Sequence, residues 1–159
     1  MNPRLLVLFF CFITLSTPPS GLTSYSQAAS FKAADLQGTF HSLEQYQGQT
    51  LVLYFWATWC PACRKEVKKI IKLYQRFHPG EMKFVSVSLD TDLKKLEKFV
   101  KDHQVPYPVL FDGKGWENAI AESYGIVSTP TFVLINPKGE IVSSGSWSSD
   151  LTKLLQKSS

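Results

Sequence analysis

Cysteine and histidine are scarce in this sequence, with three residues of each among 159. Cys60 and Cys63 are the one closely spaced pair, and no second pair is present to complete a four-ligand zinc site. The three histidines do not have metal-ligand spacing either; they are His41, His78 and His103. Arg64 follows Cys63 at the position where covalent haem attachment would require a histidine. We therefore expect no metal and no other cofactor.

Blocks of one charge and long hydrophobic runs are also missing. The formal net charge of +4 comes without a dense Lys/Arg block, which argues against nucleic acid as a partner. The apolar stretch at residues 5–15 is too short to span a bilayer comfortably. It follows a short basic start and precedes small residues at 26–28, which is the pattern of a secretory signal peptide.

This pattern predicts a signal peptide over residues 1–28 and one exported domain over residues 29–159, in the periplasm or another extracytoplasmic space. The alternative is an uncleaved membrane anchor formed by residues 5–15. Cleavage would remove Cys11 and leave Cys60 and Cys63 as the last cysteines. A bridge across so short a loop restrains little of the unfolded chain, so we expect the pair to perform chemistry and not to serve as a structural staple.

The cysteine pair lies where a predicted strand passes directly into a predicted helix. Residues 51–56 form an apolar run typical of a strand that is buried on both faces, and a helical pattern follows the pair. Cysteines three residues apart share one face of a helix, so they can close a disulfide. The helix N-terminus stabilises a thiolate on Cys60, and Pro61 suits the first helical position because its missing N–H is not needed there.

The rest of the chain alternates short strands and helices. We expect a hairpin over 31–42, a helical turn over 43–49, and extended segments over 50–55, 82–89, 107–111, 131–135 and 140–145. We expect helices over 61–78, from Asp90 or Thr91 to about 104, over 116–124 and over 148–156. The side chains expected to face the core from the second of these helices are Leu93, Leu96, Phe99 and Val100.

Two segments, together with this order of elements, resemble the thioredoxin superfamily. Residues 55–66 read FWATWCPACRKE and residues 125–135 read GIVSTPTFVLI, and both are similar to the exported TlpA/ResA/DsbE-type thiol-disulfide oxidoreductases. The resemblance covers roughly residues 31–157. It implies an α/β thioredoxin fold, with a central mixed β-sheet flanked by helices, an N-terminal β-hairpin and a central αβ insertion.

The position of each cysteine in the helix, together with the resemblance, implies different roles for the two. Cys60 is expected to be the exposed attacking thiolate, and Cys63 the shielded thiol that resolves the mixed disulfide. Tyr54 stands where thioredoxins proper carry a buried Asp, which leaves Glu66 as the nearest candidate to hold the proton that Cys63 must lose. The alternative is that Glu66 is a solvated acid that pairs with Lys69, three residues further on.

The resemblance also implies a surface that binds the substrate. Pro130 resembles the cis-proline of the family, and a cis bond would turn the backbone of Thr129 toward the sulfurs, where an extended substrate strand can pair with it. Trp59 and Pro61, which flank Cys60, are expected to face the substrate. Trp56 is expected to pack beneath the site, because side chains alternate along a strand.

The sequence therefore predicts an exported thiol-disulfide oxidoreductase that reduces protein disulfides, with apocytochrome c as the expected client. A helix N-terminus stabilises an anion by only about 0.3–2 kcal/mol, and no histidine lies within the motif to stabilise the thiolate further, which favours a reductant over a strong oxidant. The resemblance implies a membrane thiol protein as the electron donor, and we expect a monomer.

Two other functions remain open at this point. A peroxiredoxin-like thiol peroxidase needs a Thr or Ser and a Pro placed ahead of one reactive cysteine, and Thr58 is present. A non-catalytic binding module with the same fold is the second, although the intact Cys60, Cys63 and Pro130 argue against it.

Overall fold

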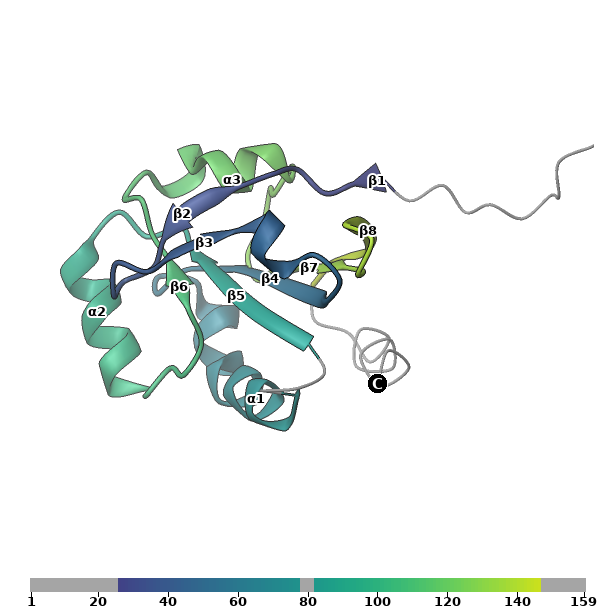
Figure 1. Cartoon of the computed structure of the whole chain (residues 1–159). Coiled ribbons are helices and arrows are strands. Elements are labelled where there is room, and N and C mark those ends of the chain that lie inside the picture. The colour runs from purple at the N-terminus through teal and green to yellow at the C-terminus, as the bar shows by residue number, and fades with distance from the viewer. Residues whose placement is uncertain (1–25, 78–81, 147–159) are drawn as a thin grey trace, which may run out of the picture.

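A six-stranded sheet forms the centre of the computed structural model, which describes residues 26–77 and 82–146 (Figure 1). The strand order is β1-β8-β7-β4-β5-β6. In that order the strands are Ser26–Gln27, Glu140–Gly145, Thr131–Ile135, Thr50–Trp56, Met82–Ser88 and Val109–Leu110. Strands β4, β5 and β6 run parallel, whereas β7 is antiparallel to both β4 and β8, and β1 is antiparallel to β8. The sheet is therefore mixed, as predicted.

Two helices cover one face of this sheet, α1 (Pro61–Phe77) and α2 (Leu93–Asp102). Tyr54 and Trp56 of β4 point to this face because side chains alternate along a strand. The ring of Tyr54 packs 6.1 Å from that of Phe84, and Phe84 in turn lies 6.0 Å from Tyr74 of α1. The ring of Trp56 lies 5.5 Å from that of Phe99 in α2. The layer between β4 and these helices is thus largely aromatic.

The opposite face is covered by α3 (Ala119–Ser123) and by the N-terminal segment. Phe55, between Tyr54 and Trp56 in β4, packs 6.1 Å from the ring of Tyr124 at the end of α3. The hydroxyl of Tyr124 donates a hydrogen bond of 2.7 Å to the carbonyl of Ala29. All seven residues of β4 are buried, so the strand that leads to the cysteine pair is held between two packed layers.

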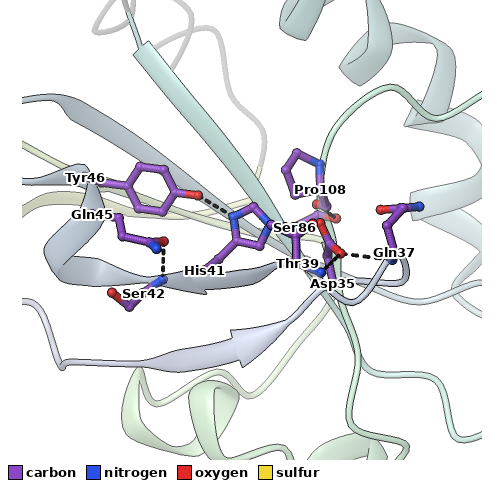
Figure 2. Close-up of polar contacts among 9 residues, drawn as sticks. All are labelled: Asp35, Gln37, Thr39, His41, Ser42, Gln45, Tyr46, Ser86 and Pro108. Atoms are coloured by element: carbon purple, nitrogen blue, oxygen red, sulfur yellow. Dashed lines mark hydrogen bonds and ion pairs between the residues drawn. The ribbon is translucent and has the colours of Figure 1, made fainter.

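The predicted N-terminal hairpin pairs β2 (Lys32–Ala34) with β3 (Phe40–Ser42) and is followed by the 3₁₀ helix η1 (Leu43–Tyr46). Figure 2 shows the polar network that holds it. His41 Nδ1 lies 2.6 Å from the hydroxyl of Tyr46, and His41 Nε2 lies 2.9 Å from Asp35 Oδ2. Asp35 Oδ1 also accepts the backbone N–H groups of Gln37 and Thr39, each at 2.9 Å.

Two groups of this network have shifted pKa values. The pKa of the Asp35 carboxyl lies below its ordinary value of 3.8. Burial raises this pKa, but the hydrogen bonds from His41, Thr39 and Gln37 together lower it by more. Burial raises the pKa of Tyr46 to about 12. The sequence did not single out this network, because its members are separated by turns and no motif joins them.

The start of α2 differs from the prediction. Its N-cap is Asp92, whose Oδ1 accepts the N–H of Lys95 at 3.1 Å, and not Asp90 or Thr91. The carboxylate of Asp90 is already hydrogen-bonded elsewhere, so it does not cap the helix. Leu93 is the first residue of α2 and is 43% exposed, so its predicted core position is wrong. Leu96 is fully buried, as predicted.

The helix predicted over residues 116–124 is divided in two. A 3₁₀ helix, η2 (Gly115–Glu117), precedes α3, and Asn118 separates them. Asn118 has an extended backbone, and its side-chain oxygen accepts the N–H groups of Ile120 and Ala121, so it ends one helix and caps the next. The helix predicted over 148–156 and the apolar stretch at 5–15 lie outside the described residues. Among the residues that are described, no helix combines the length and hydrophobicity needed to cross a bilayer.

Candidate active site

The cysteine pair lies at the start of α1, directly after β4. Cys60 precedes Pro61, the first helical residue, and Cys63 lies in the first turn. The two form a disulfide with their Cα atoms 5.3 Å apart. The backbone N–H of Cys63 points at Cys60 Sγ, with a nitrogen–sulfur distance of 3.2 Å. A free donor of the helix N-terminus is therefore directed at the sulfur of Cys60, where it would stabilise a thiolate.

Both cysteines are buried in this disulfide form. Cys60 is 3% exposed and Cys63 is 1% exposed, so the expectation of an exposed Cys60 is wrong for the oxidised protein. The carbonyl oxygen of Thr129 lies 3.5 Å from Cys60 Sγ and helps to cover it. The two sulfurs therefore differ in their surroundings and not in their exposure.

The loop that covers Cys60 comes from the segment before β7. The peptide bond between Thr129 and Pro130 is cis, which confirms the prediction made for this proline. The hydroxyl of Thr131 donates a hydrogen bond of 2.7 Å to the carbonyl of Ser128 and closes the loop. Val127, at its other end, is 89% exposed. The loop thus presents the Thr129 backbone beside the disulfide and carries an exposed apolar side chain at Val127.

Two exposed tryptophans lie next to each other beside the disulfide. Trp59 is 51% exposed and Trp116 is 45% exposed, and their ring centroids are 6.0 Å apart. The indole N–H of Trp59 donates a hydrogen bond of 3.3 Å to the carbonyl of Leu89 and fixes the ring. Trp56, in contrast, is 2% exposed, which confirms that it packs beneath the site while Trp59 faces outward.

Asp90 is a residue of the site whose role the sequence did not predict. It is 3% exposed, and its carboxylate accepts three donors. The hydroxyl of Thr58 lies 2.5 Å from Oδ1, while the N–H of Thr58 and the hydroxyl of Ser88 lie 3.0 and 2.8 Å from Oδ2. Because Thr58 comes two residues before Cys60, its hydrogen bonds to Asp90 connect the active-site loop to the segment that follows β5. The bond joins residues 32 apart in the chain, so no local pattern indicates it.

Glu66 lies in α1, one turn after Cys63, and is half-buried. Its Oε2 atom is buried and has no hydrogen-bond partner among the described residues. Burial, followed by the charges of Tyr107 and Glu66, raises the pKa of Tyr54 well above its ordinary value. One oxygen of Glu66 is thus shielded from solvent, while the residue as a whole is half-buried. No group of three or more potential metal ligands occurs in the part of the chain that the structure describes.

Comparison with known proteins places this geometry in a family. The AhpC/TSA family model matches residues 25–144. The thiol-disulfide oxidoreductase ResA of Bacillus thuringiensis is 31% identical over 116 residues, which are 73% of this chain and 65% of the relative. The thioredoxin-like protein YneN of Bacillus subtilis is 32% identical over 131 residues, which are 80% of this chain and 74% of that protein. This chain thus matches slightly less than two thirds of the length of the ResA relatives.

The structural comparison agrees. The thioredoxin domain of a thiol-disulfide oxidoreductase from Bacteroides vulgatus superposes with a TM-score of 0.74 and 28% identity, over 86% of this chain and 98% of that one. The predicted resemblance is confirmed in sequence and in fold. This chain belongs to the AhpC/TSA family and has the thioredoxin fold, with the disulfide of Cys60 and Cys63 at the N-terminus of α1.

Proposed function

We propose that this protein is a thiol-disulfide oxidoreductase that reduces disulfides in other proteins. The observation that carries the proposal is the Cys60–Cys63 disulfide at a helix N-terminus, covered by the Thr129–Pro130 loop. The names of the relatives, several of which are thiol-disulfide oxidoreductases, support it.

The reaction begins with the reduced protein. The Cys60 thiolate attacks one sulfur of a client disulfide, a bond forms between Cys60 and the client, and the second client sulfur leaves as a thiolate that takes a proton. Cys63, once deprotonated, attacks Cys60 Sγ and releases the remaining client sulfur. Two electrons have then passed from the protein to the client, and the protein is left with the disulfide that the structure contains.

The surfaces beside Cys60 are suited to hold a client during this exchange. The Thr129 backbone next to the sulfur would pair with an extended client strand. Trp59 and Pro61, which flank Cys60, are exposed and would pack against the client side chains.

We assign to Glu66 the role of accepting the proton that Cys63 loses. A carboxyl one turn from Cys63, with a buried and unpaired oxygen, is positioned to accept that proton when the mixed disulfide is resolved. The Tyr54 hydroxyl cannot replace it as a base near neutral pH, because burial raises the pKa of Tyr54 further above its already high ordinary value.

The proposed compartment rests on the N-terminal sequence, and the proposed partners rest on the resemblance to the family. A signal peptide over residues 1–28, with the domain at 29–159, would place the protein outside the cytosol, and residues 5–15 would anchor it if cleavage did not occur. A reductant in an oxidising space must be recharged, so we assign it a membrane thiol protein as its electron donor. Apocytochrome c is the proposed client, and the monomer is the proposed active form.

The peroxidase alternative receives no support from the site. A peroxiredoxin-type site needs a Thr or Ser ahead of the reactive cysteine, but the hydroxyl of Thr58 donates its hydrogen bond to the Asp90 carboxylate. The partner of Cys60 is also only three residues away. Both features favour disulfide exchange over peroxide reduction.

Paired assays test the proposal. We expect the protein to reduce insulin and to leave peroxide unconsumed, and we expect Cys60→Ala to abolish insulin reduction. Cys63→Ala should accumulate a mixed disulfide through Cys60, detectable by mass spectrometry and reversed by a small thiol. Peroxide consumption without insulin reduction would establish the peroxidase, and the absence of both activities would establish a binding module.

A further inference from the structure

A groove lies between α1 and α2 and opens beside the cysteine pair. Its volume is about 660 Å³, which is within the range of roughly 300–1,000 Å³ typical of binding sites. Thr58 and Pro61 form its wall on the side of the active site, and Phe99 and His103 line it from α2 and its C-cap. Since Pro61 follows Cys60 directly, one end of the groove lies beside the active-site motif.

The remaining lining of the groove is strongly basic. Arg64 and Lys65 contribute from α1, and Lys95 and Lys98 from α2, against a single carboxylate from Asp102. The net charge of the protein is small, so this concentration of cations is a local feature of the groove.

Acidic neighbours offset part of this charge on the α2 side only. Lys98 pairs with Asp102 at 2.7 Å, and Lys95 pairs with Asp92 at 3.3 Å. Both pairs are exposed, and exposed pairs are weak and easily exchanged for another anion. Arg64 has no ion-pair partner within residues 26–77 and 82–146 and faces the groove one turn from Cys60. The wall nearest the sulfur is therefore left with uncompensated positive charge.

We propose that this groove binds an acidic segment of the protein whose disulfide exchanges with Cys60. The proposal rests on the proposed function, and it specifies the class of client: proteins with Asp or Glu residues close in sequence to the reactive cysteine. A negatively charged segment in the groove would increase the rate at which the client associates and would hold its disulfide beside Cys60. A peptide segment fits this site better than a membrane surface does, because the cations line a concave groove.

Synthetic disulfide-linked peptides with Glu residues beside the cysteine, and matched peptides with Gln, are the probes. The full-length protein reduces each one in turn, and kcat/KM is divided by the rate of the same peptide with a small dithiol to remove intrinsic differences in reactivity. We expect the corrected ratio of Glu to Gln peptides to be roughly fivefold at low ionic strength. The ratio should approach one at about 0.5 M salt, where surface charges are screened.

Two double variants separate the groove from the overall charge of the protein. Lys65→Glu with Lys95→Glu reverses two cations of the groove, and we expect it to invert the preference so that the Gln peptide reacts faster. Lys72→Glu with Lys101→Glu makes the same charge change on exposed positions of α1 and α2 that do not line the groove, and it should keep the preference.

Each other outcome overturns the proposal in a recognisable way. A corrected ratio near one in the unmodified protein refutes a role for the groove, and so does the same loss of preference in both double variants. In either case, reduction of both peptides still upholds the proposed function. Reduction of neither peptide refutes the proposed function itself. A last measurement is sedimentation of the protein with phosphatidylglycerol vesicles. If the ratio is near one, and the unmodified protein and the control variant sediment with the vesicles but the groove variant does not, the groove binds anionic lipid and not a client.

Discussion

The hydrogen bonds of Asp90 predict how strongly the active-site loop depends on one buried carboxylate. Asp90→Ala would leave three donors without their acceptor: the N–H and hydroxyl of Thr58 and the hydroxyl of Ser88. Asp90→Asn keeps most of these contacts, because its amide oxygen can replace Oδ2 while its NH₂ group faces the Thr58 hydroxyl, which can rotate and accept. The two variants therefore remove different amounts of the same network.

The magnitudes follow from the cost of unmet hydrogen bonds. A hydrogen bond to a charged group contributes about 1.5–3 kcal/mol, and a buried donor left unpaired costs about 1–3 kcal/mol. Since hydroxyls rotate and water can enter the space left by alanine, we expect Asp90→Ala to lower the free energy of unfolding by about 3–5 kcal/mol. Asp90→Asn should lower it by about 1–2 kcal/mol. Against a typical stability of about 5–15 kcal/mol, the alanine variant would be marginal, so the asparagine variant is the one to assay for exchange.

The measurement is guanidinium unfolding of the oxidised protein followed by tryptophan fluorescence, together with insulin reduction by the reduced protein. Asp112→Asn is the matched control, because Asp112 is exposed and, among the residues that the structure describes, its carboxylate accepts a hydrogen bond only from the N–H of Lys114. We expect the control to stay within about 0.5 kcal/mol of the unmodified protein. We also expect Asp90→Asn to slow insulin reduction while still folded, since the loop that carries Cys60 loses its fixed position. An Asp90→Asn protein as stable and as active as the control would refute the importance assigned to this contact.

Three further predictions concern other parts of the molecule. Trp116→Ala should change the free energy of unfolding by less than about 1 kcal/mol, because the ring is half-exposed beside Trp59. The same variant should slow the reduction of insulin more than the reduction of a small disulfide. Equal slowing of both reactions would contradict a role of Trp116 in client binding. Glu66→Gln should slow exchange and alter the pH dependence of cysteine alkylation, and an unchanged pH profile would return Glu66 to the role of a surface acid. Because the folded pKa of Asp35 lies below 3.8, its ionised form stabilises the fold above that pH, and this stabilisation is lost as the pH falls through the folded value. Asp35→Asn should therefore lower the urea midpoint at about pH 7 and reduce the further loss between about pH 7 and pH 3; an unaltered pH dependence would show that Asp35 is not the group responsible.

The elements that the sequence predicted most closely are those with a strong local pattern. The strands predicted over 131–135 and 140–145 match β7 and β8 at both ends, because an apolar run and the turn from Asn136 to Gly139 define them locally. The strand predicted over 50–55 ends one residue too early, because β4 continues to Trp56. The cysteine motif, the helix that follows it and the cis bond before Pro130 could likewise be predicted from the residues and the family they resemble.

The parts that the sequence could not supply depend on contacts between distant segments. Asp90, Thr91 and Asp92 are all good helix caps, and capping preference alone does not choose among them. Asp90 is excluded as the cap because its carboxylate is bound to Thr58, 32 residues earlier, and the structure has Asp92 as the cap. The burial of Cys60 has a similar origin, since the Thr129 carbonyl that lies against its sulfur is 69 residues away.

Tyr54 connects these two kinds of information. At this position the stacked rings of Phe132, at 4.4 Å, and Trp56, at 6.2 Å, leave an apolar layer where a carboxylate would be poorly solvated. Two buried polar atoms have no hydrogen-bond partner among the described residues: the indole nitrogen of Trp56, whose ring stacks with Tyr54, and Oε2 of Glu66. An unpaired buried polar atom costs about 1–3 kcal/mol, so each one calls for an explanation such as a catalytic role or an ordered water. Because Tyr54 stands where thioredoxins proper carry a buried Asp, the sequence already made Glu66 a candidate to hold the proton of Cys63. Its buried oxygen, which has no partner among the described residues, is the physical reason to expect that the carboxyl takes part in proton transfer.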